Sequence, residues 1–303
     1  MVREDAHPVD GEARLTAEVR PAESLAPDRD ERGWTENAPS RAWFPRLDLA
    51  EVWSSRELTL ILALRNIKIR YKQTVLGVAW AILQPLAGVA IFSVVLGRLA
   101  NVPSDGIPYP VFAFAGLALW MYFTNAASAA AESLAQYREL VTKVYFPRLL
   151  APLAAVLPGL IDFGITLLAV AVFMAIFSVA PSLAIVSLPA WILAAVVTTF
   201  GVGIWLAALN ARYRDVRNAL TFLLQLWFFA TPVVYASSLV EGDLRFLLAA
   251  NPIAGLVDGF RWSLIGAPSP WPYALVSFAV ALVILSSGLV YFARVQRRFA
   301  DFI

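Results

Sequence analysis

The chain has 303 residues, of which 59% are hydrophobic and 15% charged, whereas an average soluble domain is roughly 45 to 50% apolar and 25% charged. The 24 basic and 22 acidic residues gather near the two ends and in short clusters, so long stretches between them carry no charge. This composition excludes an ordinary soluble globule and is typical of a chain that crosses a bilayer several times.

Residues 1–40 are rich in Glu, Asp, Arg, Ala and Pro and lack the apolar core of a secretory signal. Because such a segment buries too little apolar surface to fold, we expect a disordered cytosolic tail. Residues 41–72 are expected to hold an amphipathic helix and residues 73–303 a transmembrane domain. The absence of cysteine excludes disulfides but does not fix the compartment.

Six transmembrane helices are predicted in the transmembrane domain. Three uncharged runs are longer than the roughly 18 to 20 residues that cross the hydrocarbon core, and a longer apolar interval that contains only Asp162 is divided in two near 180–182. A last helix follows a Pro-rich stretch at 267–272. The expected spans are 73–97, 109–131, 149–178, 183–209, 218–240 and 272–293. The predicted fold class is an all-α integral membrane protein, with short external helices before the last span.

Basic residues mark one side of these spans. They are Arg56, Arg65, Lys68, Arg70, Lys72, Arg138, Lys143, Arg148, Arg212, Arg214, Arg217, Arg294, Arg297 and Arg298. The opposite side has only Arg98, Arg245 and Arg261 in connections of similar length. By the positive-inside rule both termini are therefore cytoplasmic.

The chemistry of most enzymes has no residues to support it here. The only histidine is His7, so neither a membrane-embedded His metal site nor a Ser-His pair can form. None of the 16 glycines precedes a lysine, and the phosphate-binding loop of nucleotide hydrolases needs that step. The acids of the cytoplasmic loops stand singly rather than in a metal-binding cluster. We therefore expect no catalytic site, no metal and no cofactor on this chain, and if ATP drives the protein, another subunit binds it.

Two cytoplasmic helices are predicted. In Glu57–Lys72 an apolar stripe is accompanied by a basic row, which suits a helix lying on the membrane as an anchor to anionic lipid, as a docking face for a partner protein, or as both. Its bases are Arg65, Lys68, Arg70 and Lys72. The segment 132–148 is a second short amphipathic helix ended by a proline, and either docking or membrane contact explains it. Its candidate residues are Glu132, Leu134, Tyr137, Glu139, Val141, Lys143, Tyr145, Phe146, Pro147 and Arg148.

Five stretches resemble a known family, in order along the chain. They are NIKIRYKQTVLGVAWAILQP (66–85), VTKVYFPR (141–148), LAALNARYRDVR (206–217), LQLWFFATPVVY (224–235) and NPIAGLVDGFRWSLIG (251–266). They look like the polysaccharide-exporting permeases of the type-two ABC transporter class, which includes O-antigen, teichoic acid and galactan exporters. The resemblance begins near Arg56 and does not include the acidic tail.

The resemblance implies a homodimer of six-helix permeases in the bacterial plasma (inner) membrane. Each copy would bind a cytosolic ATP-binding-cassette subunit that holds ATP and Mg, and the assembly would move a lipid-linked polysaccharide outward. Carried over by position, the helix from Glu132 to Pro147 would be the coupling helix that enters the ATPase, and the helix before residue 72 would be the interface helix. Related exporters of a drug, haem or lipid are the alternative; a channel or a proton-driven carrier is the third.

A path for a hydrated glycan needs aromatic faces and uncharged polar groups. The candidate channel residues are Trp80, Gln84, Trp120, Tyr122, Phe123, Asn125, Gln225, Trp227, Phe228, Phe229 and Tyr235. For any single aromatic, an interfacial belt or simple packing is the competing interpretation. A kink at Pro85 or Pro232 is expected to open backbone carbonyls toward a cavity.

Asp162 is the one carboxylate expected deep within a span, and an ionisable group there is a functional hypothesis by default. The alternative is that it caps a helix or pairs with Arg212, with Asn210 or with a lipid headgroup.

An external helix is expected to start at Asn251-Pro252 and to end near Gly266. It is interpreted as an amphipathic helix at the outer leaflet with Asp258 and Arg261 on its surface, and either covers the span ends or gates the exit. The residues of this candidate gate are Asn251, Pro252, Leu256, Phe260 and Arg261.

Overall fold

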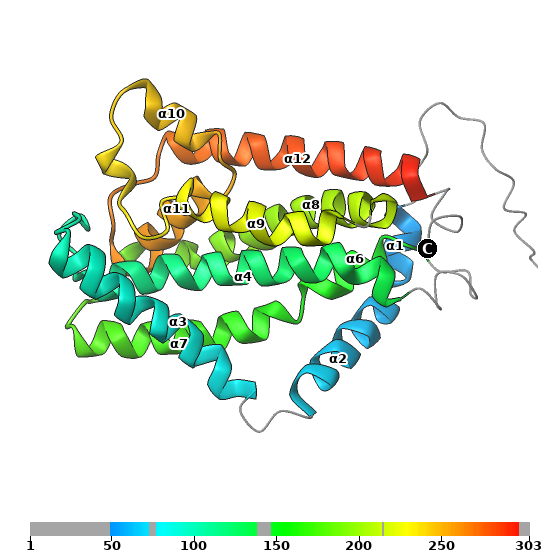
Figure 1. Cartoon of the computed structure of the whole chain (residues 1–303), viewed down its shortest axis with the longest axis horizontal. Coiled ribbons are helices and arrows are strands. Elements are labelled where there is room, and N and C mark those ends of the chain that lie inside the picture. The colour runs from blue at the N-terminus through cyan, green and yellow to red at the C-terminus, as the bar shows by residue number, and fades with distance from the viewer. Residues whose placement is uncertain (1–48, 73–76, 138–146, 214, 297–303) are drawn as a thin grey trace, which may run out of the picture. The chain divides into compact units, whose positions relative to one another are not determined.

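The computed structural model describes residues 49–72, 77–137, 147–213 and 215–296. All of them belong to one compact unit, Ala42–Ile303, and the expected tail at residues 1–40 lies outside the described residues. Every regular element that they form is a helix (Figure 1). In order, the elements are α1 (Leu49–Ser54), α2 (Arg56–Lys72), α3 (Gly77–Phe92), the π-helix η1 (Ser93–Leu99), α4 (Tyr109–Gln136), α6 (Leu150–Val156), α7 (Gly159–Ile176), η2 (Leu183–Ser187), α8 (Leu188–Arg212), α9 (Val216–Phe229), η3 (Ser237–Leu239), α10 (Asp243–Ala249), α11 (Ala254–Ile265) and α12 (Tyr273–Val295).

Five segments among the described residues are long and apolar enough to cross a membrane. They are Ala79–Leu99, Tyr109–Gln136, Leu150–Ile176, Leu183–Arg212 and Tyr273–Val295. The all-α membrane class is therefore confirmed, and the count of six spans stays a prediction.

The expected fifth span, 218–240, is not one helix. α9 has 14 residues, and at 1.5 Å per residue it is about 21 Å long, short of the roughly 30 Å hydrocarbon core. After Phe229 the chain continues without a long helix, and Thr231–Val234 are buried. Irregular backbone is tolerated at membrane depth only when protein surrounds it, so the packing of 231–234 explains how the helix can end early.

Helix α4 is the centre of the bundle, with 78% of its most apolar window buried against 11% in Ala79–Leu99. Small side chains allow its neighbours to approach closely. A Cβ added at Gly203 on α8 would lie only 2.7 Å from the Cβ of Ala130 on α4. Helices α3, α7 and α12 pack around this core and leave large apolar side chains exposed, among them Leu168 and Val283.

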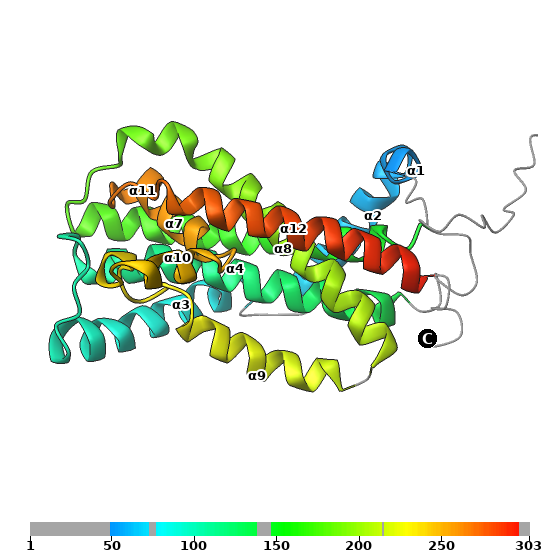
Figure 2. The same cartoon turned by 90° about the horizontal axis from the view of Figure 1, so that it is seen from above.

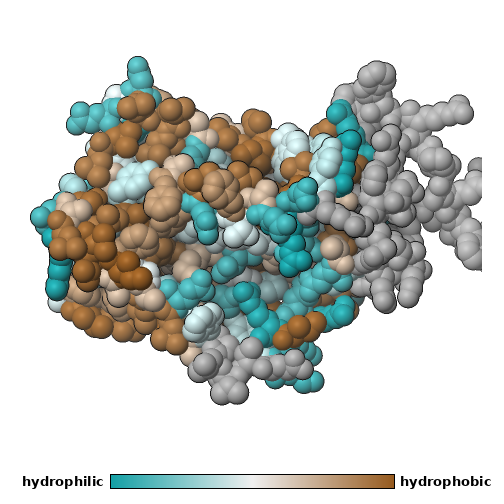
Figure 3. Space-filling model, viewed as in Figure 1, coloured by the Kyte–Doolittle hydropathy of each residue, from teal (hydrophilic) through white to brown (hydrophobic). Residues whose placement is uncertain are grey.

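The described chain begins and ends at the same end of the bundle. Figure 1 and, seen from above, Figure 2 show α1 and the end of α12 there, which we call the α1 end, and α10 and α11 toward the opposite α11 end. Apolar residues cover most of the surface toward the α11 end, whereas hydrophilic residues gather toward the α1 end (Figure 3).

Helix α2 differs from the predicted amphipathic helix in the face that it buries. Leu62 and Ala63 are buried beside the ends of α4, α6 and α8, whereas Leu60 and Leu64 from the predicted apolar stripe are more than half exposed. Both faces of the helix carry apolar side chains. One face packs on the bundle, which leaves the other for lipid or a partner.

Candidate functional site

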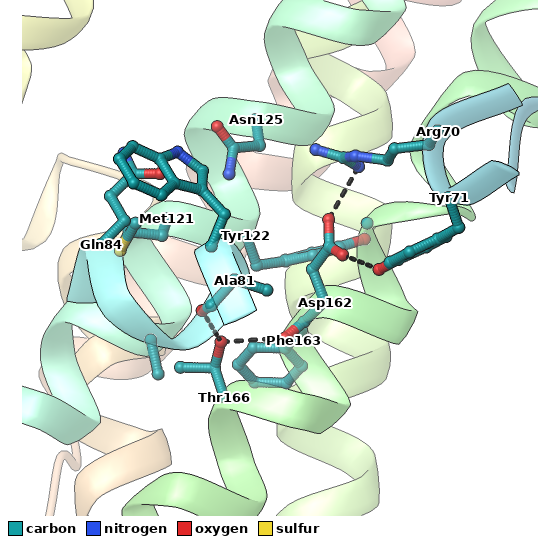
Figure 4. A pocket seen from close by; sticks show the side chains of 13 residues that line it. Arg70, Tyr71, Ala81, Gln84, Met121, Tyr122, Asn125, Asp162, Phe163 and Thr166 are labelled. Atoms are coloured by element: carbon teal, nitrogen blue, oxygen red, sulfur yellow. Dashed lines mark hydrogen bonds and ion pairs between the residues drawn. The ribbon is translucent and has the colours of Figure 1, made fainter. Parts of the chain in front are cut away.

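Four helices, α2, α3, α4 and α7, enclose a pocket of about 290 Å³ (Figure 4). It combines charged, amide, hydroxyl and aromatic groups within an otherwise apolar bundle. Its polar side chains are Arg70, Tyr71, Gln84, Asn125, Asp162 and Thr166, and its rings belong to Trp80, Tyr122 and Phe163. We treat it as the candidate site, because it places charged and polar side chains against three membrane-crossing segments.

A helix break positions the acid of this pocket. α6 ends at Val156 and α7 begins at Gly159, with Pro158 between them unable to donate a backbone hydrogen bond. Asp162 therefore lies in the first turn of α7, inside the apolar segment Leu150–Ile176. A carboxylate in a first turn is favoured by the helix dipole.

The partners of Asp162 come from α2, as Figure 4 shows. Nη1 of Arg70 lies 2.7 Å from Oδ2 of Asp162, and the Tyr71 hydroxyl donates to Oδ1. The Arg70 side chain is 47% exposed and that of Asp162 19%, so solvent screens the pair, and exposed pairs contribute ~0 to 1 kcal/mol. The pair therefore holds α2 against α7 without locking it there.

The predicted partners of Asp162 are occupied elsewhere. Nδ2 of Asn210 donates to the carbonyl of Ala131 at 2.9 Å, and the guanidinium of Arg212 lies over the ring of Tyr213. The alternative that Asp162 pairs with Arg212 or Asn210 is wrong, because its carboxylate pairs with Arg70 and Tyr71 of α2.

Burial, together with the hydrogen bond to Asp162, raises the pKa of Tyr71 to about 12. The phenol therefore stays neutral and remains a hydrogen-bond donor at every physiological pH.

The hydroxyl of Tyr122 stands out in the wall of the pocket. Its side chain is 4% exposed, and its oxygen has no hydrogen-bond partner among the described residues. Buried polar groups are nearly always paired. Figure 4 shows this ring reaching from α4 toward the side of the pocket that holds Asp162.

Thr166 joins two walls of the pocket. Its hydroxyl lies 2.8 Å from the carbonyl of Asp162, one turn earlier on α7, and 3.3 Å from the carbonyl of Ala81 on α3. Sequence reasoning did not single out Thr166, Phe163 or Met121. Phe163 and Thr166 follow Asp162 by one and four residues, and this helical spacing was a usable signal for them.

The structure divides the predicted channel residues into separate groups. Four of them, Trp80, Gln84, Tyr122 and Asn125, line the pocket. The rings of Trp120, Phe123, Trp227 and Phe228 instead pack on one another between α4 and α9, with centroids 5.2 to 5.7 Å apart. Gln225 and Phe229 are exposed on α9, and Tyr235 follows it, half-buried. A channel role for these residues stays a prediction.

The predicted coupling helix does not begin at Glu132. α4 continues through Gln136, so Glu132 and Leu134 belong to its last turns and Tyr137 follows directly. Oε1 of Glu132 pairs with Nε of Arg217 at 2.9 Å, and the Tyr137 hydroxyl donates to Oδ1 of Asn66 on α2 at 2.7 Å. The predicted residues Glu139, Val141, Lys143, Tyr145 and Phe146 lie outside the described residues.

Beyond that gap the chain resumes at Pro147 and Arg148. Nη1 of Arg148 donates to the carbonyl of Gln296, which joins the start of α6 to the end of α12. Burial lowers the pKa of Arg148.

The bases of the predicted interface helix face two ways. Arg65, Lys68 and Lys72 line a shallow apolar groove with Ile61, Leu64 and Ile69. Arg70 turns instead into the polar pocket. Arg70 is two residues from both Lys68 and Lys72, which is about 200° around the helix, so its side chain leaves the opposite side of α2.

The expected external helix is not a surface helix. α11 begins at Ala254. Leu256 and Phe260 are buried, and Arg261 is only 1% exposed. Its guanidinium donates to the carbonyls of Phe112 and Pro232, at 3.2 and 2.6 Å, and to that of Val233. The assignment of Arg261 to the surface is wrong, because three backbone carbonyls in the protein interior accept hydrogen bonds from its guanidinium. The carbonyl of Pro232 is one of them.

Asn251 and Pro252 precede α11 in a turn. Oδ1 of Asn251 accepts from the backbone N–H of Ile253 at 3.1 Å, as a cap would. Pro252 is buried. Gating by these residues stays a prediction.

Comparison with known proteins gives one family. The model of the ABC-2 type transporter family matches residues 57–265. An O-antigen export system permease protein RfbA of Myxococcus xanthus is 30% identical over 258 residues, which cover 83% of this chain and 97% of that protein. A protein of the same name from Klebsiella pneumoniae is 27% identical over 246 residues, covering 81% and 94%.

Proposed function

Because the chain belongs to the ABC-2 type transporter family, we propose that it is the membrane permease of an ATP-driven exporter that carries a lipid-linked polysaccharide from the cytoplasmic side outward. The observation that carries the cargo class is its similarity, over more than four fifths of its length, to two permeases named for O-antigen export. The pocket agrees with that cargo, since it presents ring faces and amide groups suited to sugars.

The energy for transport comes from a separate subunit in this proposal. The chain has no Gly-Lys step, so ATP and Mg are bound by two cytosolic ATP-binding-cassette subunits, one for each permease. The segment that follows α4 in sequence and the exposed bases of α2 receive the mechanical work. The Tyr137–Asn66 hydrogen bond supports this role, because it ties the end of α4 to α2.

A second copy of the chain completes the conduit. α9 leaves Phe222, Leu223, Leu226 and Phe229 each more than half exposed, and Trp80 on α3 is 61% exposed. We place the partner protomer against these faces, so that Gln225, Phe229 and the matching residues of both copies line one path. We place the protein in the plasma (inner) membrane with both termini in the cytoplasm, an orientation that the distribution of bases supports.

Deletion and copurification test the proposal. Deleting the gene should abolish surface glycan of the exported type and leave lipid-linked glycan inside the cell, and the gently solubilised permease should bring an ATPase subunit with it. Unchanged surface glycan in the deletion strain would overturn the proposal. A drug or lipid exporter would instead leave the glycan intact and change resistance or lipid content.

A further inference from the structure

The pocket has two chemically different halves. Among the described residues that line the pocket, Arg70 on α2 is the one cation, and it lies against Asp162 and Tyr71. The other half, on α3 and α4, offers the indole of Trp80 and the amides of Gln84 and Asn125, and the ring of Tyr122 reaches from α4 toward the Asp162 side. A guanidinium fork suits the oxygens of a phosphate, and rings with amides and hydroxyls suit a sugar. One ligand that satisfies both halves is a sugar joined to a phosphate.

We propose that the pocket binds the phosphate-linked first sugar of the lipid-linked cargo, and that the phosphate replaces the Asp162 carboxylate on Arg70. This inference rests on the proposed function. It names a part of the cargo that the fold and the comparisons leave open, namely the junction between lipid and glycan.

The unpaired hydroxyl of Tyr122 is an independent sign of a ligand. It is buried, and it has no partner in the described part of the chain although the pocket lies beside it. Leaving such a group unpaired is costly in a low-dielectric surrounding. A sugar hydroxyl in the pocket would pair with it.

The Arg70–Asp162 ion pair is suited to exchange. The carboxylate holds the place that a phosphate oxygen would take, at 2.7 Å from Nη1, and the guanidinium is 47% exposed to whatever enters. When the phosphate arrives, Asp162 keeps the hydrogen bond from Tyr71. The exchange would remove the Arg70–Asp162 ion pair between α2 and α7 and keep the Tyr71 hydrogen bond, so that loading of the pocket loosens the attachment of α2 to α7.

The size of the pocket limits what fits. About 290 Å³ lies at the small end of ligand sites, which range from about 300 to 1,000 Å³. That volume admits one sugar with its phosphate rather than a polysaccharide. Exposed apolar side chains next in sequence to pocket residues, Ile161 beside Asp162 and Leu83 beside Gln84, give the lipid tail a place outside.

Binding to the permease–ATPase complex in phosphatidylcholine nanodiscs tests the proposal. The probe is farnesyl diphosphate, compared with farnesol and with inorganic diphosphate. We expect farnesyl diphosphate to bind at least tenfold more tightly than farnesol. Arg70→Gln should weaken it at least tenfold, and Asp162→Asn should tighten it about threefold or more by removing the competing carboxylate. Tighter binding cannot result from misfolding.

Arg56→Gln is the matched control, because Arg56 is exposed at the opposite end of α2 and outside the pocket. Its affinity should stay within twofold of the wild type. Should Arg70→Gln fail to fold, Arg70→Lys keeps the charge without the fork and should still weaken the probe severalfold. A prenyl diphosphate carrying one sugar should lose affinity in Tyr122→Phe, while farnesyl diphosphate should not.

Three outcomes would overturn the inference. The first is equal binding by the wild type and Arg70→Gln or Arg70→Lys, and the second is weaker binding by Asp162→Asn. The third is loss of probe binding when the nanodiscs contain phosphatidylglycerol, because the site would then take a phospholipid headgroup. The deletion strain tests the proposed function separately. If the wild-type chain exports glycan but the pocket variants bind the probe as well as the wild type does, only the inference about the pocket is rejected.

Discussion

The indole Nε1 of Trp227 donates to Oδ1 of Asn251 across 3.0 Å, joining α9 to the turn that precedes α11. The same amide donates from Nδ2 to the hydroxyl of Thr231 at 2.8 Å and to the carbonyl of Ala230 at 3.2 Å. One side chain thus supplies partners where α9 stops. It pairs the carbonyl of Ala230, which a continuing helix would have paired with its own backbone.

Replacing Asn251 should therefore detach the end of α9. We expect Asn251→Ala to lower the stability of the fold by about 2 kcal/mol, since buried donors lose their acceptor. The measurement is thermal unfolding of the detergent-purified protein, followed by tryptophan fluorescence. The exposed Asn218 on α9 provides the control, because Asn218→Ala in a helix should not lower the midpoint.

Arg261 should be far more sensitive to substitution than other arginines of the α11 end. Arg261→Met fills similar space but leaves the carbonyls of Pro232 and Val233 without their donor, so we expect a loss of about 3 kcal/mol or more. The guanidinium also lies 3.6 Å from the centroid of the Phe112 ring, an attraction that methionine lacks. Arg98→Met at an exposed position should change the unfolding midpoint little; equal shifts in both variants would contradict the assignment.

Most of the architecture could be predicted because its signals are local. Long apolar runs specify α4, α8 and α12 directly, and the positions of basic residues specify direction. The irregular parts were harder. Pro232 is a local signal for a break in 218–240, because proline lacks the N–H of the helix ladder. The side chain that pairs the carbonyl of Ala230 after the break, Asn251, lies over 20 residues away in sequence and has no local signal.

The site was predicted in part for the same reason. The clustering of rings and amides identified Trp80, Gln84, Tyr122 and Asn125, which share the pocket. The partner of Asp162 was missed because Arg70 lies on a helix that composition assigns to the membrane surface, and only the packing of α2 on the bundle brings them together. Likewise Arg261 carries a charge that alone predicts exposure, and its acceptors are backbone carbonyls, which leave no mark in a sequence.

Alanine substitutions at two helical glycines should separate the effect of close packing on stability from the effect of helix propensity. A Cβ at Gly116 would collide with the guanidinium of Arg261 and the carbonyl of Val233, whereas one at Gly164 meets nothing within 4 Å. We expect Gly116→Ala to destabilise the fold by about 2 kcal/mol or more. Gly164→Ala should be neutral or stabilise it by up to about 1 kcal/mol, because alanine is the better helix former. Unfolding midpoints of the two variants compare them directly, and a stable Gly116→Ala would mean that Arg261 can move.

The pair formed by Glu132 and Arg217 should affect transport rather than stability. It joins the last turns of α4 to the first turn of α9, but its side chains are 47% and 70% exposed, so we expect Glu132→Gln to change stability by less than about 1 kcal/mol. If an ATPase moves the segment that follows α4 in sequence, we expect this pair to transmit the movement from α4 to α9. Glu132→Arg should then lower export and ATPase stimulation by cargo severalfold, and the double variant Glu132→Arg with Arg217→Glu should restore part of both. ATPase rates of the reconstituted complex measure the coupling, with the exposed Glu241, next to α10, changed to arginine (Glu241→Arg) as a charge-matched control. Loss in the single variant without recovery in the double one would show that Glu132 acts through another partner.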